Sequence, residues 1–128
     1  MPAADQSPSN NKRKSRRVNV RTPEVMSSVQ TEVESHYRSQ VVEKFRDSDN
    51  CYTIDNTTVI LAKQFGFCYG VERAIDLAYA TRRVFPDRRV YLIGEIIHNP
   101  EVNRQIHEMG IQQIDSYPSK EVLDNLSP

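Results

Sequence analysis

Apolar residues recur every four positions in the first half of the chain. They are Val25, Val29, Val33, Tyr37, Val41 and Phe45. This spacing places one apolar stripe along a helix, and Thr22 and Pro23 suit the start of that helix as N-cap and first helical residue. The pattern predicts one helix from Pro23 to about Arg46. The polar stretch DSDNCYTIDN (47–56) predicts a loop, so residues 23–56 form a helical extension.

The second half of the chain alternates between short apolar runs and helical patterns. The runs TTVILA, RVYLIG and IQQI predict strands at residues 57–62, 89–94 and 111–114. Helical periodicity covers residues 70–85 and 99–110, and a short helix follows Ser119. Continuous apolar, β-branched runs are typical of strands buried in a parallel sheet. The alternation predicts an α/β fold: a small three-layer parallel-sheet domain over residues 57–128.

Charge changes the picture only at the N-terminus. The 128 residues carry no net charge, but residues 1–21 contain six basic side chains and only Asp5 as an acid, a local charge of +5. The polar, proline-containing composition predicts a disordered basic tail over residues 1–22. Such a tail could bind nucleic acid, but no aromatic residues that would stack on bases lie between the charges. A solvated tail is the favoured interpretation, and nucleic acid is an unlikely partner.

The sequence contains no apolar stretch near the roughly 20 residues that cross a bilayer. No apolar segment follows the N-terminal charges as in a secretory signal. We therefore expect no membrane partner and a cytoplasmic location. The Ser- and Arg-containing start leaves a plastid location as the alternative. In a reducing compartment Cys51 and Cys68 are expected to be free thiols, which can serve in catalysis or bind a metal.

Two loops carry the candidate chemistry. In open α/β sheets, ligands bind beyond the carboxyl ends of the strands, and Cys68 and His98 each lie there, just before a predicted helix. If their strands are neighbours, the two residues share one sheet edge. A helix N-terminus stabilises negative charge, so a thiolate is expected to be favoured at Cys68. Beside His98, the N–H groups of Asn99 and Glu101 could help to hold an anion. Three aromatic residues would exclude water: Phe65, Phe67 and Tyr69.

From spacing alone several alternatives stay open. Cys68 could equally be an inert buried thiol and His98 an ordinary surface residue. Cys68 could also be a nucleophile with His98 as its base. Cys51 lies in the predicted loop without a companion and receives no role. The other two histidines, His36 and His107, are predicted to be solvated on exposed helix faces.

The segments FGFCYGVERAI and GEIIHNPEVN carry a more specific signal. Together they resemble the 4-hydroxy-3-methylbut-2-enyl diphosphate reductase (LytB/IspH) family, whose first domain has a GFC-x-GV-[ED]-RA motif and then an [EQ]-[IV]-[IV]-HN motif. The resemblance covers residues 58–114 well. It implies that this domain is one of three similar α/β domains, each of which supplies one cysteine to a [4Fe–4S] cluster. It implies that Cys68 is the first cluster ligand and that His98 contacts the substrate diphosphate.

The same resemblance implies an activity. The family reduces an allylic diphosphate to isopentenyl and dimethylallyl diphosphate in the non-mevalonate isoprenoid pathway, with electrons from a ferredoxin or flavodoxin. The further family motifs, including two more cysteines, are absent from this sequence. The chain is therefore expected to be the N-terminal portion of the enzyme, to lack catalytic residues of its own, and to be inactive without the missing C-terminal portion. A non-catalytic binding module with a basic tail is the alternative.

Overall fold

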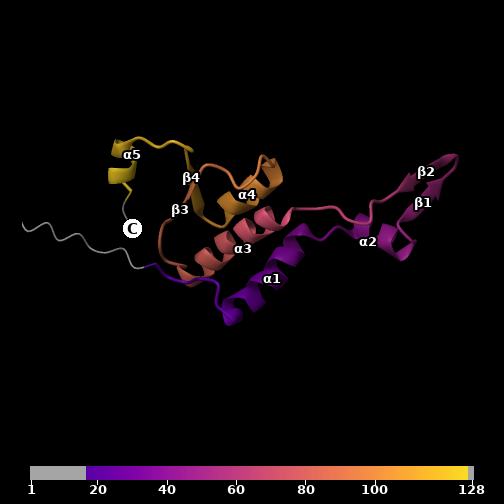
Figure 1. The fold of residues 1–128 in the computed structure, drawn as a ribbon, viewed down its shortest axis with the longest axis horizontal. Coiled ribbons are helices and arrows are strands. Elements are labelled where there is room, and N and C mark those ends of the chain that lie inside the picture. Colours follow the sequence, from indigo (N-terminus) through magenta and orange to yellow (C-terminus); the bar gives the residue numbers. More distant parts are fainter. Residues whose placement is uncertain (1–16, 127–128) are drawn as a thin grey trace, which may run out of the picture.

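The computed structural model describes residues 17–126, which fold into five helices and four short strands (Figure 1). In chain order these are α1 (Pro23–Tyr37), α2 (Gln40–Asp47), β1 (Cys51–Ile54), β2 (Thr57–Ile60), α3 (Tyr69–Val84), β3 (Val90–Ile93), α4 (Pro100–Glu108), β4 (Ile111–Ile114) and α5 (Lys120–Asp124). The predicted α/β class is confirmed. Among the described residues, no helix is both long and apolar enough to span a bilayer.

The unit β3–α4–β4 follows the sequence prediction closely. β3 and β4 pair in parallel from Val90 opposite Ile111 to Ile93 opposite Ile114, and α4 connects them. Asn99 is the N-cap of α4 because its side-chain oxygen accepts the N–H of Val102 at 3.2 Å. The backbone beyond α4 turns into the left-handed region, which glycine adopts without strain: Gly110 has φ +78°.

The core lies between the helices and this short sheet. α3 lies between α1 and the β3–α4–β4 unit (Figure 1). The apolar stripe predicted for α1 is confirmed at Val29, which is completely buried, while Val25 and Val33 pack at the edge of the core. The buried apolar side chains come from α1, α3, α4, β4 and the segment before α1: Val20, Val29, Ile75, Tyr79, Ala80, Val102, Ile106 and Ile111.

The single helix predicted from Pro23 to about Arg46 is wrong, because the structure contains two helices. The chain becomes extended at Arg38 (φ −70°, ψ 128°). Ser39 then starts α2 as an N-cap, its Oγ accepting the N–H of Val42 at 3.4 Å. Serine is a strong N-cap residue, and its local hydrogen bond competes with continuation of the helix. The apolar stripe is therefore interrupted, and Val41 is exposed on α2.

The prediction for residues 47–62 is also wrong. Cys51 lies in a strand, not a loop, and β2 pairs antiparallel with β1 in a hairpin, whereas a buried parallel strand was expected. A two-residue turn at Asp55–Asn56 joins the strands, with Asp55 in the left-handed region (φ 51°). Asp and Asn tolerate such turns, so local turn chemistry favours the hairpin. In the described residues the parallel sheet thus has two strands, β3 and β4.

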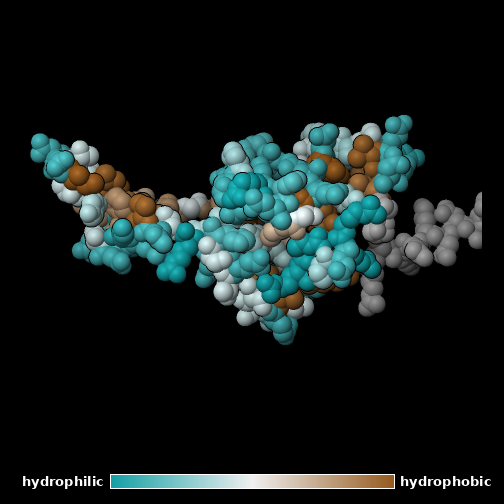
Figure 2. Space-filling model, turned by 180° about the vertical axis from the view of Figure 1, so that it is seen from behind, coloured by the Kyte–Doolittle hydropathy of each residue, from teal (hydrophilic) through white to brown (hydrophobic). Residues whose placement is uncertain are grey.

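Residues 40–60, which we call the arm, extend away from the rest of the fold (Figure 1). Both strands of the arm are exposed along their whole length. Apolar side chains therefore gather on its surface (Figure 2), among them Ile54, Val59 and Ile60. Most of the predicted disordered tail, residues 1–22, lies outside the described residues. Its last residues pack on the fold: Val20 is buried in the core, and Nη2 of Arg21 lies 4.0 Å from Oδ2 of Asp76.

Candidate functional site

Cys68 is the N-cap residue of α3, as the sequence predicted. Its backbone is extended (φ −70°, ψ 159°) and its carbonyl oxygen accepts the N–H of Glu72 at 3.0 Å. The side chain makes no capping hydrogen bond, and the thiol is free and exposed. A methyl group placed on Gly70 would lie 4.0 Å from Sγ, so the sulfur lies beside the first turn of the helix. The thiol is therefore open to a metal ion, which a cysteine binds as its thiolate.

The aromatic wall predicted around Cys68 is only partly present. Phe67 is partly buried and packs against the core. Phe65 and Tyr69 are exposed, and Phe65 instead lies under the guanidinium group of Arg46, 5.6 Å from the ring centroid. Water therefore reaches the thiol in the described part of the chain. Sequence reasoning failed here because β2 leaves the parallel sheet, so the loop that follows has no neighbouring strand to cover it.

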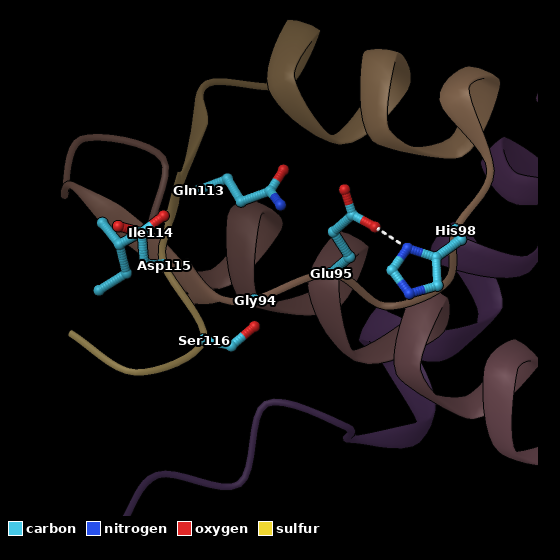
Figure 3. A pocket seen from close by; sticks show the side chains of 7 residues that line it. All are labelled: Gly94, Glu95, His98, Gln113, Ile114, Asp115 and Ser116. Carbon is cyan, nitrogen blue, oxygen red and sulfur yellow. Dashed lines mark ion pairs between the residues drawn. The ribbon is translucent and has the colours of Figure 1, made fainter.

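His98 lies in the loop between β3 and α4 and is almost fully exposed, with 97% of its side chain accessible. Its Nδ1 atom is 2.6 Å from Oε2 of Glu95 (Figure 3). The Nδ1–H group donates a hydrogen bond to the Glu95 carboxylate, which fixes the orientation of the ring and leaves Nε2 free to face a ligand. The sequence motif names both residues but did not reveal this contact, since an acid three positions before a histidine is common in loops.

A hollow of about 530 Å³ opens beside His98, at the carboxyl ends of β3 and β4 (Figure 3). It is the edge at which α/β proteins bind ligands. Two of the residues that line it are acidic, Glu95 and Asp115. Gly94 is buried in it at φ +75°, where a side chain would meet the Ser116 hydroxyl at 2.8 Å. The wall of the hollow therefore leaves no room for a side chain at position 94. Its two acidic residues do not favour an anion, so His98 is the side chain there that could bind one.

The anion site expected at the N–H groups next to His98 is wrong. The N–H of Glu101 donates to the Asn99 side chain at 3.0 Å, and the N–H of Asn99 donates to the Ile97 carbonyl at 2.8 Å. Both donors are therefore occupied by the cap of α4. Any anion held here would depend on the imidazole of His98 rather than on the backbone.

The structure does not join Cys68 to His98. Their strands, β2 and β3, are not neighbours, so the shared sheet edge that the sequence suggested is wrong. Within residues 17–126 no hydrogen bond or ion pair connects the two side chains. A Cys–His nucleophile pair, which requires hydrogen-bond contact, therefore has no support. Cys51, the second free thiol, is exposed on the arm.

An iron–sulfur cluster is the cofactor that the sequence motif implies. Cys68 fits one ligand position, because its thiol is free, exposed and at a helix N-terminus. A [4Fe–4S] cluster is held by several thiolates, and the described residues contain no group of three or more His, Cys, Asp or Glu side chains placed to hold a metal. The chain thus fits one part of such a site.

Two residues of α1 have contacts that the sequence did not predict. His36 is exposed, as predicted, but its Nδ1 also lies 2.6 Å from the hydroxyl of the buried Tyr79. Tyr37 contacts the ring of Phe67 edge-on, with 5.2 Å between ring centroids. The contacting residues are 30 and 43 positions apart in the chain. Helical and strand periodicities relate only residues a few positions apart, so the sequence carried no signal for these contacts. His107 is exposed, as predicted.

Comparison with known proteins agrees with the motifs. A family model described as LytB protein matches residues 59–125, which include Cys68 and His98. A 4-hydroxy-3-methylbut-2-enyl diphosphate reductase from Nostoc sp. is 42% identical over 85 residues, covering 66% of this chain and 21% of that protein. The enzyme of the same name from Acaryochloris marina is 43% identical over 86 residues, covering 67% of this chain and 21% of its own length.

A third reductase of that name, from Picosynechococcus sp., is 43% identical over 81 residues, covering 63% of this chain and 20% of its own length. No solved structure matches. The chain spans about a fifth of the length of the curated relatives it matches. Because the family model covers more than half of the chain and both motif residues, the chain belongs to the LytB protein family.

Proposed function

We propose that this chain is the N-terminal part of a reductase that converts 4-hydroxy-3-methylbut-2-enyl diphosphate to isopentenyl and dimethylallyl diphosphate. One observation carries the proposal: the LytB match includes Cys68 at the N-terminus of α3 and His98 before α4. The relatives of that name are about five times longer than the matched segment. In this proposal the rest of the site comes from parts of the enzyme outside this chain. The proposed location of the enzyme is the cytoplasm.

In this proposal Cys68 supplies one thiolate to a [4Fe–4S] cluster. The thiol is suited to that role, since it is free and exposed beside the first turn of α3 and such clusters are held by cysteine thiolates. When bound, the cluster would supply single electrons, received from a ferredoxin or flavodoxin, and an iron that acts as a Lewis acid. The other cluster ligands would belong to the remaining domains of the enzyme.

The proposed role of His98 is to bind the diphosphate of the substrate. Glu95 holds Nδ1, so Nε2 is the atom that faces a ligand. With Nδ1 donating to Glu95, Nε2 is the nitrogen that would contact a phosphate oxygen, which it does as a donor when the ring is protonated. The hollow at the carboxyl ends of β3 and β4 then offers space next to the donor.

A chimera tests the proposed function. In it, this chain replaces the segment of the Nostoc reductase that it matches, and the purified product is reconstituted with iron and sulfide under anaerobic conditions. We expect the chimera to contain a [4Fe–4S] cluster and to reduce the allylic diphosphate with a chemical electron donor. The isolated 128-residue chain is expected to do neither. A folded chimera without iron or turnover would contradict the proposal.

Replacement of His98 tests the diphosphate contact in the same chimera. Hydrogen bonds to charged groups contribute about 1.5–3 kcal/mol, so His98→Gln is expected to raise KM by about 10- to 150-fold. His107→Gln is the matched control, because His107 is an exposed histidine on the neighbouring helix α4. The two variants are compared by steady-state kinetics with varied substrate. Equal KM values for both variants would remove His98 from the substrate site.

A further inference from the structure

Tyr37, the last residue of α1, contacts the loop that carries Cys68. Its ring meets Phe67 edge-to-face, with centroids 5.2 Å apart and planes at 87°. This is a favourable arrangement for two aromatic rings. Phe67 directly precedes Cys68 and is the aromatic residue of the loop that packs against the core. The contact therefore acts one residue away from the thiol.

The surroundings of Tyr37 connect this loop to the start of α4. The Tyr37 hydroxyl is enclosed and lies beside the Tyr79 hydroxyl of α3. Burial raises the pKa of Tyr37, the interaction with the Tyr79 hydroxyl partly opposes this rise, and the carboxylate of Glu101 in the first turn of α4 adds to it. The residue therefore stays neutral and lies near the helix that begins just after His98. The contact with Phe67 is made by the ring of Tyr37 and not by its hydroxyl, so the ring is the part of Tyr37 that supports the Cys68 loop.

The position of Tyr37 is fixed by the contacts of α1 with α3. Val29 is completely buried. Oε2 of Glu32 pairs with Arg83 at 2.9 Å, and His36 contacts the Tyr79 hydroxyl at 2.6 Å. These contacts run along the helix and end at Tyr37. The loop after β2 has no strand beside it, so this aromatic pair replaces the support that a neighbouring strand would give.

We infer that Tyr37 is a positioning residue that holds the Cys68 loop in place through the ring of Phe67. α1 lies outside residues 59–125, the segment that the family model matches. The N-terminal extension would thus act as a brace for the loop of the family motif. The consequence for metal binding rests on the proposed function, in which Cys68 is a cluster ligand, whereas the brace itself is a property of this chain alone.

The test uses the full 128-residue chain without iron. Cys51, which is free and exposed on the arm, is replaced by serine so that a nitroxide label attaches to Cys68 alone. Electron paramagnetic resonance then measures the ratio of mobile to immobile label. Loss of an aromatic pair corresponds to about a 2- to 12-fold change in such an equilibrium. We expect Tyr37→Ala to increase the ratio of mobile to immobile label by this factor, and Tyr37→Phe, which keeps the ring, to leave the ratio unchanged.

Two further variants separate the brace from general loosening of α1. Val33→Ala removes a partly buried side chain one turn earlier on the same helix, and it is expected to leave the label immobile. Tyr37→Leu keeps most of the apolar volume without the ring and is the variant to use if Tyr37→Ala does not fold. The inference is overturned if Val33→Ala mobilises the label as much as loss of the Tyr37 ring, or if neither Tyr37→Ala nor Tyr37→Leu mobilises it.

This readout is independent of the proposed enzyme. If the chimera contains no iron while the label responds as expected, the brace stands and the proposed function fails. If the chimera is active while the mobility of the label does not change on loss of the Tyr37 ring, the proposed function stands and the brace fails.

Discussion

The substitution Cys68→Ser is expected to lower the turnover of the chimera by more than about 100-fold. Mutation of a residue that only hydrogen-bonds to a metal ligand already lowers metal affinity or activity by about 10- to 100-fold. Serine keeps the size of the side chain but replaces a soft thiolate, which suits iron–sulfur clusters, by a poorly ionised hydroxyl. The thiol caps nothing and is exposed, so the fold of α3 does not depend on it. Iron and sulfide content, visible absorption and turnover are measured together.

The second thiol of the chain provides the matched control. Cys51 is also free and exposed, but it lies in β1 opposite Ile60 on the arm. Cys51→Ser is expected to retain the iron content and turnover of the chimera, and circular dichroism should show both variants folded. If Cys68→Ser kept its cluster and turnover, or if Cys51→Ser lost them to the same extent, Cys68 would not be a cluster ligand.

The substitution Tyr79→Ala is expected to remove about 3–5 kcal/mol from the free energy of unfolding, the range for large buried aromatic residues. The side chain is only 2% exposed and lies where α3 faces α1. Small domains have a total stability of about 5–15 kcal/mol, so this single change could unfold the chain. Its hydroxyl contacts His36 at 2.6 Å. Urea unfolding followed by circular dichroism measures the effect.

Two controls divide the effect of Tyr79 into its parts. Tyr79→Phe retains the ring and removes only the contact with His36, so its expected cost is about 1 kcal/mol. Burial raises the pKa of Tyr79, so the phenol is neutral at neutral pH and this contact does not depend on its ionisation. Leu77→Ala, at a residue of α3 that is 47% exposed, should cost less than Tyr79→Ala. Equal destabilisation by Leu77→Ala and Tyr79→Ala would show that Tyr79 is not central to the core.

Several features of the fold were predictable because they depend on neighbouring residues in the chain. The cap of α4 by Asn99, the left-handed turn at Gly110 and the N-cap by Ser119 follow from side-chain chemistry within a few positions. The same is true of the place of Cys68 before α3. Of the candidate site, the sequence therefore predicted which elements carry Cys68 and His98, and the motifs predicted the family.

The pairing partner of the strand over residues 57–60 was not predicted in this way. The run TTVILA suits a buried parallel strand and an exposed hairpin equally well by composition, and the turn at Asp55–Asn56 together with the free partner β1 selects the hairpin. That selection removes the shared edge expected for Cys68 and His98 and leaves the thiol accessible.

Residues close together in the chain were therefore enough to predict the helix caps and the β3–α4–β4 unit, and the two motifs predicted the family. The contacts of Tyr37 with Phe67 and of His36 with Tyr79 followed only from the packing of α1 against α3 and the loop before it. The physical reason is the range of the interactions. Caps and turns are satisfied within a few residues, whereas aromatic contacts and strand pairing depend on which surfaces the packed helices bring together.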